Sequence, residues 1–220
     1  MKKFILIFVS SIIGTVLLAW VIYNTYNKIE LKKEKAVSYI LSNSEKELIH
    51  DGDIVLRYGH GFVSDYIVKS FNEPFSISHC GIVTKSLNKL SVIHSESSSY
   101  LSEEGIQDQD FDEFVDAGHK NSVMIVRFNR CPDNELYKIS ERAKYYLAKK
   151  IPFDYAFDPK DTEYMFCSEI IWHVFLDAFN KNIFLNQNGE TDFNQFRNFY
   201  NPKDFNVIIN HQKDKKLIVF

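Results

Sequence analysis

An uncharged apolar run near the N-terminus constrains this chain more than any other feature. Residues 4–23 read FILIFVSSIIGTVLLAWVIY and follow two lysines. A helix rises 1.5 Å per residue, so about twenty residues span the roughly 30 Å hydrocarbon core of a bilayer. No small-residue cleavage site follows Ala19, because bulky residues come next. We therefore expect an uncleaved transmembrane helix rather than a cleaved signal peptide or a buried core helix.

The run divides the chain into three predicted parts. These are a membrane anchor at residues 1–27, a helical stalk or first helix at 28–50, and a body at 51–220. Lysines flank the apolar run on both sides, so the positive-inside rule does not choose an orientation. A short N-terminal tail on such a segment usually stays inside, which predicts a membrane-anchored protein whose body is extracytoplasmic.

The body combines strand and helix patterns without regular βαβ alternation, which predicts an α+β fold with an antiparallel sheet packed against helices. Apolar residues make up 45% of the chain, enough for one core, and the net charge of −3 excludes a basic nucleic-acid surface. Strands are expected at Ser78–Val83, Leu90–Glu96 and Ser122–Phe128. The first two form a hairpin around Asn88. Amphipathic helices are expected at Asn134–Lys150 and from Cys167 onward.

Cys167 opens the second of these helices. Unpaired N–H groups and the helix dipole at that position favour a thiolate, whereas a buried cysteine elsewhere is an inert apolar residue. Position alone leaves both interpretations open. The other two cysteines are Cys80 and Cys131, so at least one thiol is free. No spacing of cysteines and histidines matches a structural zinc site, and we expect neither a metal nor another cofactor.

A nucleophilic thiol needs a base, and two histidines lie on the predicted hairpin. His79 opens its first strand, and His94 lies late in the second, so the two rings can face each other. Alternation along the strand places Cys80 on the opposite face from His79, in the core. We therefore predict that Cys80 is structural and Cys167 reactive. Glu96 shares the parity of His94 and is the alternative residue for orienting the base.

Four stretches in order give the body a resemblance to a known family. They are DGDIVLRYGHGFVSDYIV, FSISHCGIV with VIHSE, IPFDYAFDPKDTEYMFCSEIIW, and NPKDF near the end. Their order resembles that of the circularly permuted, NlpC-type papain-like cysteine hydrolases of the YiiX/YebB-like group. In that group the histidine strand precedes the cysteine helix.

The resemblance implies roles for particular residues. Cys167 would attack a carbonyl, His79 would be the general base, and His94 would hold the third polar position. Tyr58 is a candidate donor to the oxyanion, and Phe153 and Phe157 are candidate pocket walls.

The expected function is a membrane-anchored cysteine peptidase or amidase that acts by a thioester mechanism, for example on a cell-wall peptide. Two alternatives stay open. One is a thiol acyl hydrolase or acyltransferase acting on lipids, which a long apolar groove beside the thiol would favour. The other is a catalytically silent binding protein on the same fold.

Overall fold

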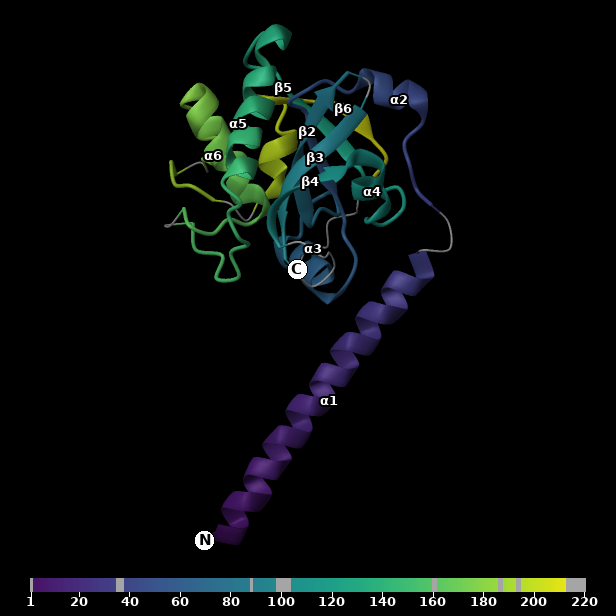
Figure 1. The fold of residues 1–220 in the computed structure, drawn as a ribbon, viewed down its shortest axis with the longest axis vertical. Helices are drawn as coiled ribbons and strands as arrows, with labels where there is room; N and C mark the ends of the chain where they lie inside the picture. The colour runs from purple at the N-terminus through teal and green to yellow at the C-terminus, as the bar shows by residue number, and fades with distance from the viewer. Residues whose placement is uncertain are drawn as a thin grey trace.

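The computed structural model describes residues 2–34, 38–87, 89–97, 104–159, 162–185, 188–192 and 195–212. Figure 1 shows a body of sheet and helices from which one long helix projects. The elements in chain order are α1 (Lys2–Glu34), α2 (Asn43–Leu48), β1 (Ile54–Arg57), α3 (Phe62–Phe71), β2 (His79–Ser86), β3 (Lys89–Glu96), β4 (Gly105–Asp110), α4 (Phe111–Asp116), β5 (Met124–Phe128), η1 (Asp133–Glu135), α5 (Tyr137–Ala148), α6 (Cys167–Phe179), η2 (Phe196–Tyr200) and β6 (Phe205–Asn210).

Helix α1 contains the apolar run. Its stretch Ile7–Ile29 has 23 residues with a mean hydropathy of 1.9, and none of that stretch is buried against the body. This helix is long and apolar enough to cross a membrane. A signal sequence near the N-terminus has the same length and composition. Residues 28–50, predicted as a helical stalk or first helix, contain parts of two helices among the described residues. Helix α1 continues past residue 27 to Glu34, and α2 is a separate helix of six residues.

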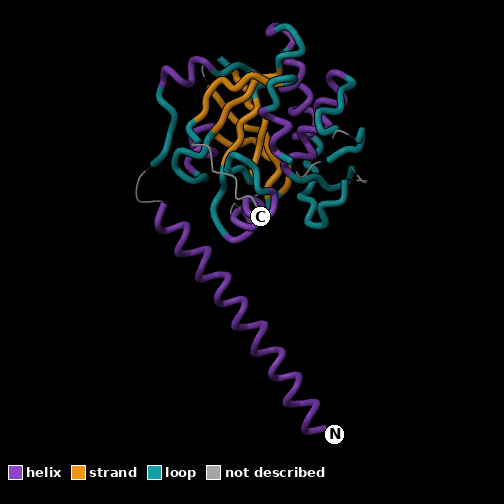
Figure 2. Tube along the Cα trace, turned by 180° about the vertical axis from the view of Figure 1, so that it is seen from behind, coloured by secondary structure: helices purple, strands orange, loops and turns teal. Residues whose placement is uncertain are grey.

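The body is built on one antiparallel sheet of six strands in the order β4-β3-β2-β1-β5-β6. Figure 2 shows these strands as a single twisted layer with helices beside it. The predicted α+β class with an antiparallel sheet is therefore confirmed. Strands β2 and β3 form the predicted hairpin, and β1 joins β2 to β5.

Each face of the sheet has its own apolar core, because alternate residues of a strand point to opposite faces. Helices α5 and α6 pack on one face, where Cys80 and Ile82 of β2 are fully buried. The segment around α4 packs on the other face, where Val83 of β2 lies against Phe114 and its neighbours. The core position predicted for Cys80 is correct.

Most elements expected from the sequence are present. The hairpin strands run somewhat longer than predicted, and α5 and α6 begin and end close to the expected residues. Asn88, predicted at the hairpin turn, lies outside the described residues. Strand β4 and helix α4 were not predicted. Strand β4 reads GIQDQD, which has few of the branched and aromatic residues that mark a strand.

Candidate active site

The hairpin brings two imidazoles into hydrogen-bond contact. His79 begins β2 and His94 lies near the end of β3, and both side chains leave the sheet on the α4 face. The distance from His79 Nε2 to His94 Nδ1 is 2.9 Å, and the rings meet edge to face. His94 is fully buried and His79 is nearly so. The sequence-based expectation that these rings face each other is confirmed.

A glycine between the two histidine positions makes this contact possible. A Cβ atom on Gly81 would lie 2.4 Å from Val92 Cγ1 and 3.1 Å from His94 Cβ. Real Cβ atoms essentially never come within 3.0 Å of another heavy atom. The space beside Gly81 is therefore already filled by the side chains of β3, including the base of His94.

The surroundings of His94 Nε2, the ring nitrogen that faces away from His79, indicate which nitrogens of the two imidazoles carry protons. His94 Nε2 and the Oε1 of Gln109 on β4 are both buried without a hydrogen-bond partner among the described residues, and Gln109 is near enough to raise the pKa of His94. A proton on His94 Nε2 would satisfy both atoms. His94 Nδ1 then accepts a hydrogen bond from His79 Nε2–H, and His79 Nδ1 keeps a free lone pair. We assign these tautomers, in which His79 can act as a base through Nδ1.

A buried ion pair lies beside the imidazoles. Glu96 Oε2 is 3.5 Å from His94 Nδ1 and 3.8 Å from His79 Nε2. The same oxygen lies 3.3 Å from the Arg57 guanidinium, which also donates to the backbone oxygen of Phe114 and stacks on its ring at 4.1 Å. Glu96 therefore pairs with Arg57 as well as facing the histidines.

Burial and Arg57 set the charge of this cluster. Burial, and then the positive charge of Arg57, lower the pKa of His94 to about 3 and hold the pKa of His79 well below its ordinary value. Burial raises the pKa of Glu96, and Arg57 opposes that rise. Both imidazoles are therefore neutral at pH 7.

Cys167 is the first residue of α6, as predicted. The turn before it is held by the Glu169 carboxylate, which accepts a hydrogen bond of 3.2 Å from the Phe166 N–H. A hydrogen bond from the Cys80 thiol lowers the pKa of Cys167 most. Backbone N–H groups of Cys80 and Ser168 lower this pKa further, whereas burial and the Glu96 charge raise it. Together these effects lower the pKa of Cys167 from its ordinary value.

Cys80 has a larger part in the site than the sequence suggested. It was predicted to be a structural core residue, and it is fully buried. Its side chain nevertheless lies close to the Cys167 sulfur, and burial followed by that contact raises the pKa of Cys80 well above its ordinary value. The reason is that α6 begins directly against β2. Sequence alternation could place Cys80 on a face, but not beside the start of a helix 87 positions later.

The sulfur and the base are not in contact, because Cys167 packs against the core on the α6 face, whereas both imidazoles lie against Phe114 on the α4 face. Within the part of the chain that the structure describes, the Cys167 sulfur makes no hydrogen bond to His79 or His94. The sulfur instead lies against Cys80, the chain neighbour of His79. Catalytic hydrogen bonds are often long or poorly aligned without substrate and tighten when it binds.

The segment before the cysteine is tied to the sheet. Ser95 Oγ on β3 donates a buried hydrogen bond of 2.5 Å to the backbone oxygen of Met165, two residues before Cys167. Met165 N–H in turn donates to Pro152 O at 3.0 Å. The cysteine is therefore held relative to the strand that carries His94.

The remaining predicted residues lie around this centre. Tyr58 donates its hydroxyl proton to Asp65 of α3 and stacks on His119, so that proton is already committed. Phe157 packs edge to face on Phe153 and lies 5.5 Å, centroid to centroid, from Phe166, the residue before Cys167. The two phenylalanines thus stand next to the start of α6, and their role as pocket walls stays a prediction.

Comparison with known proteins supports the fold assignment. No protein-family model matches the sequence, and no curated protein is significantly similar to it. Among solved structures, the chain is similar to the metalloprotein yiiX from Escherichia coli O157:H7. The TM-score is 0.51 at 21% identity, covering 61% of this chain and 68% of that one. The likeness shows that the chain shares the fold of the YiiX-like group.

Proposed function

We propose that this protein is a cysteine hydrolase in which Cys167 attacks a carbonyl and His79 is the general base. The observation that carries the proposal is the His79–His94 hydrogen bond, which in the tautomers assigned above takes the His79 Nε2 proton and leaves Nδ1 as an acceptor. The second support is the lowered pKa of Cys167 at the start of α6.

The proposed reaction has two steps. In the first, Cys167 sulfur bonds to the substrate carbonyl carbon while the thiol proton passes to His79 Nδ1, which then protonates the leaving amine or alcohol. Because His79 is neutral at rest, proton transfer accompanies the attack rather than preceding it. In the second step, water gives its proton to His79 and its oxygen to the thioester, which releases the acid and restores the thiol.

The backbone at the start of α6 supplies the electrostatic support. The backbone N–H groups of Cys80 and Ser168 lie near enough to the sulfur to lower its pKa. Those of the first helical turn have no partner within the helix and are suited to a developing oxyanion. His94 acts on the base, by holding the ring and tautomer of His79, rather than on the substrate.

The first candidate substrate is a peptide amide close to the membrane, because α1 can tether the body there. A lipid acyl ester is the second candidate, favoured by the aromatic pair Phe153 and Phe157 beside the start of α6. In both cases membrane anchoring with an extracytoplasmic body is part of the proposal.

Trapping the covalent intermediate tests the proposal. The full chain in detergent micelles is mixed with a peptide-amide library or with phospholipid, quenched in acid, and mapped by mass spectrometry. The expected result is an acyl mass on Cys167 from one of the two classes, absent from Cys167→Ser and strongly reduced in His79→Ala. An unmodified Cys167 with both classes would favour the silent binding protein.

Because the similar structure yiiX is described as a metalloprotein, we asked whether His79, His94 and Glu96 could hold a metal ion. His79 Nε2, His94 Nδ1 and Glu96 Oε2 form a triangle with sides of 2.9, 3.5 and 3.8 Å, whose centre is about 2.0 Å from each atom. That is the ligand distance of zinc. However, the Arg57 cation lies 3.3 Å from the same carboxylate oxygen and would repel a dication. The cluster is therefore a poor match for a metal, and no step of the reaction uses one.

A further inference from the structure

Helix α3 presents an apolar face to the outside. Its residues Ile67 and Phe71 pack inward against the core. Its outward residues Phe62, Val63 and Tyr66 are between 45% and 64% exposed. The outer face of a helix on a soluble protein is normally polar. Helix α1 touches this face at Phe62, but the three side chains stay largely exposed.

The same helix is attached to α1 at the end of the apolar span. The ring of Tyr23 packs edge to face on Phe62, and the side chain of Asn27 accepts a hydrogen bond of 3.2 Å from Phe62 N–H. Tyr26 also donates to Asp65 of α3. The apolar stretch ends at Ile29. If that stretch crosses a bilayer, residues 23–27 lie where hydrocarbon meets headgroups, and α3 lies at the same depth.

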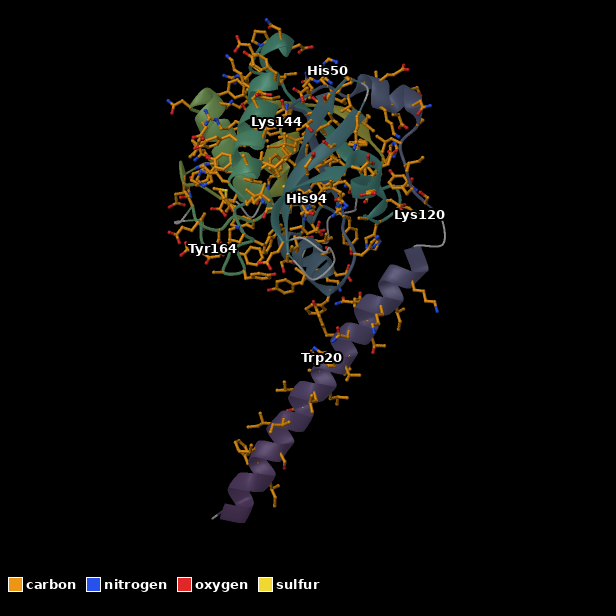
Figure 3. The ribbon with its side chains drawn as sticks, viewed as in Figure 1. Trp20, His50, His94, Lys120, Lys144 and Tyr164 are labelled. Carbon is orange, nitrogen blue, oxygen red and sulfur yellow. The ribbon has the colours of Figure 1, made fainter. Side chains whose placement is uncertain are left out.

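A second exposed aromatic group lies on the same side of the body. Tyr155, Phe157 and Tyr164, in the segment that leads into α6, are between 46% and 58% exposed. Figure 3 shows Tyr164 on the side of the body that faces the N-terminal half of α1, whereas His50 and Lys144 lie toward the opposite end. Figure 1 places α3 on that same lower side.

We propose that α3, together with Tyr155, Phe157 and Tyr164, forms a membrane-contact surface that rests on the bilayer beside α1. A bilayer is the partner that fits, because the surface is continuous with a helix that can span one, and because exposed tyrosine and phenylalanine are typical of the membrane–water interface. Exposed Lys28 and Lys69 flank it and suit lipid phosphates.

The membrane-contact surface also indicates a substrate class. This inference rests on the proposed function. Residue 164 is three positions before Cys167, and the Phe157 ring packs against Phe166. A bilayer under this segment would bring the ester carbonyls of lipids, which lie at the boundary of hydrocarbon and headgroup, close to the start of α6. Membrane lipid acyl esters are therefore the substrate class that this surface favours over soluble peptides.

Quenching by brominated lipid tests the surface without requiring activity. The full chain is placed in nanodiscs of brominated phosphatidylcholine, in a Trp20→Phe background that keeps Trp172 as a common signal. The variants are Tyr66→Trp and Tyr164→Trp, and the matched control is Tyr145→Trp, a tyrosine on α5 that is 47% exposed. We expect added quenching, relative to unbrominated lipid, in the first two variants and none beyond background in the control.

Equal quenching in all three variants, or none in any of them, would overturn the proposal. The proposal would also be overturned if an added protein shielded Tyr66 while lipid had no effect, because the surface would then be a protein-binding one. Labelling of Cys167 with iodoacetamide in detergent is measured on the same variants. Retained labelling with no quenching rejects the surface alone, whereas lost labelling in the parent chain rejects the proposed enzyme.

Discussion

Replacing Gly81 by alanine should damage both the fold and the site in a predictable way. The added methyl carbon would lie 2.4 Å from Val92 Cγ1, whereas ordinary contacts begin at 3.4 Å, so β2 and β3 must separate by about 1 Å. Overpacking of this kind costs about 1–3 kcal/mol of unfolding free energy. The same shift moves His94, whose Cβ would be 3.1 Å from the new carbon. A misplacement of about 1 Å can cost about 100-fold in rate.

A double-mutant cycle identifies the cause. Val92→Ala removes the methyl group that the new side chain meets, so the Gly81→Ala/Val92→Ala pair should be less destabilised than the sum of the single variants, by about 1 kcal/mol. Denaturant unfolding of the full chain in micelles measures stability, and the rate of thioester formation on Cys167 measures the site. A Gly81→Ala protein that loses less than about 0.5 kcal/mol and keeps its rate would refute the packing argument.

Three further results are expected. His94→Ala should reduce turnover less than His79→Ala, because His94 acts only through His79; a larger loss at His94 would mean that the two roles are reversed. Ser95→Ala should cost about 0.5–1.5 kcal/mol, because it removes the shorter of two hydrogen bonds to the buried Met165 carbonyl and leaves only Asp154 N–H, at 3.4 Å; unfolding in denaturant checks this. The free energy of unfolding should fall as the pH drops below about 6.5. The reason is that the histidines bind protons in the unfolded chain, whereas His79 and His94 stay neutral in the folded protein. Each contributes a loss of about 2 kcal/mol by pH 5, partly offset by the raised pKa of Glu96, and a flat urea midpoint from pH 7 to 5 would contradict it.

The strands and helices that carry the site were predictable because their patterns are local. The alternation in SHCGIV and VIHSE set the faces of His79, Cys80 and His94, and the polar start of the Cys167 helix marked its N-terminus. The α+β class followed from the same patterns. Each of these inferences needs only the period of one element.

The parts that were missed depend on contacts between distant segments. Arg57 looked like an ordinary strand residue, yet it is buried beside Glu96, and its charge adds to the effect of burial in lowering the pKa of both imidazoles. Gln109 lies on β4, whose sequence lacks the residue pattern of a strand, so its position beside His94 could not be predicted. The contact between Cys80 and Cys167 arises only when α6 docks on β2. No periodicity encodes which sheet position meets a given helix end.

Alkylation of the three cysteines across pH tests the central claim most directly, since the proposed enzyme requires a selectively reactive Cys167. Cys131 is the internal reference, because it is partly exposed and burial raises its pKa, and Cys80 is fully buried. The full chain is treated briefly with iodoacetamide from pH 5.5 to 9 and mapped by mass spectrometry. The account predicts that Cys167 reacts first and at the lowest pH, while Cys131 follows only at alkaline pH. Cys131 reacting first, with Cys167 inert up to pH 9, would contradict it.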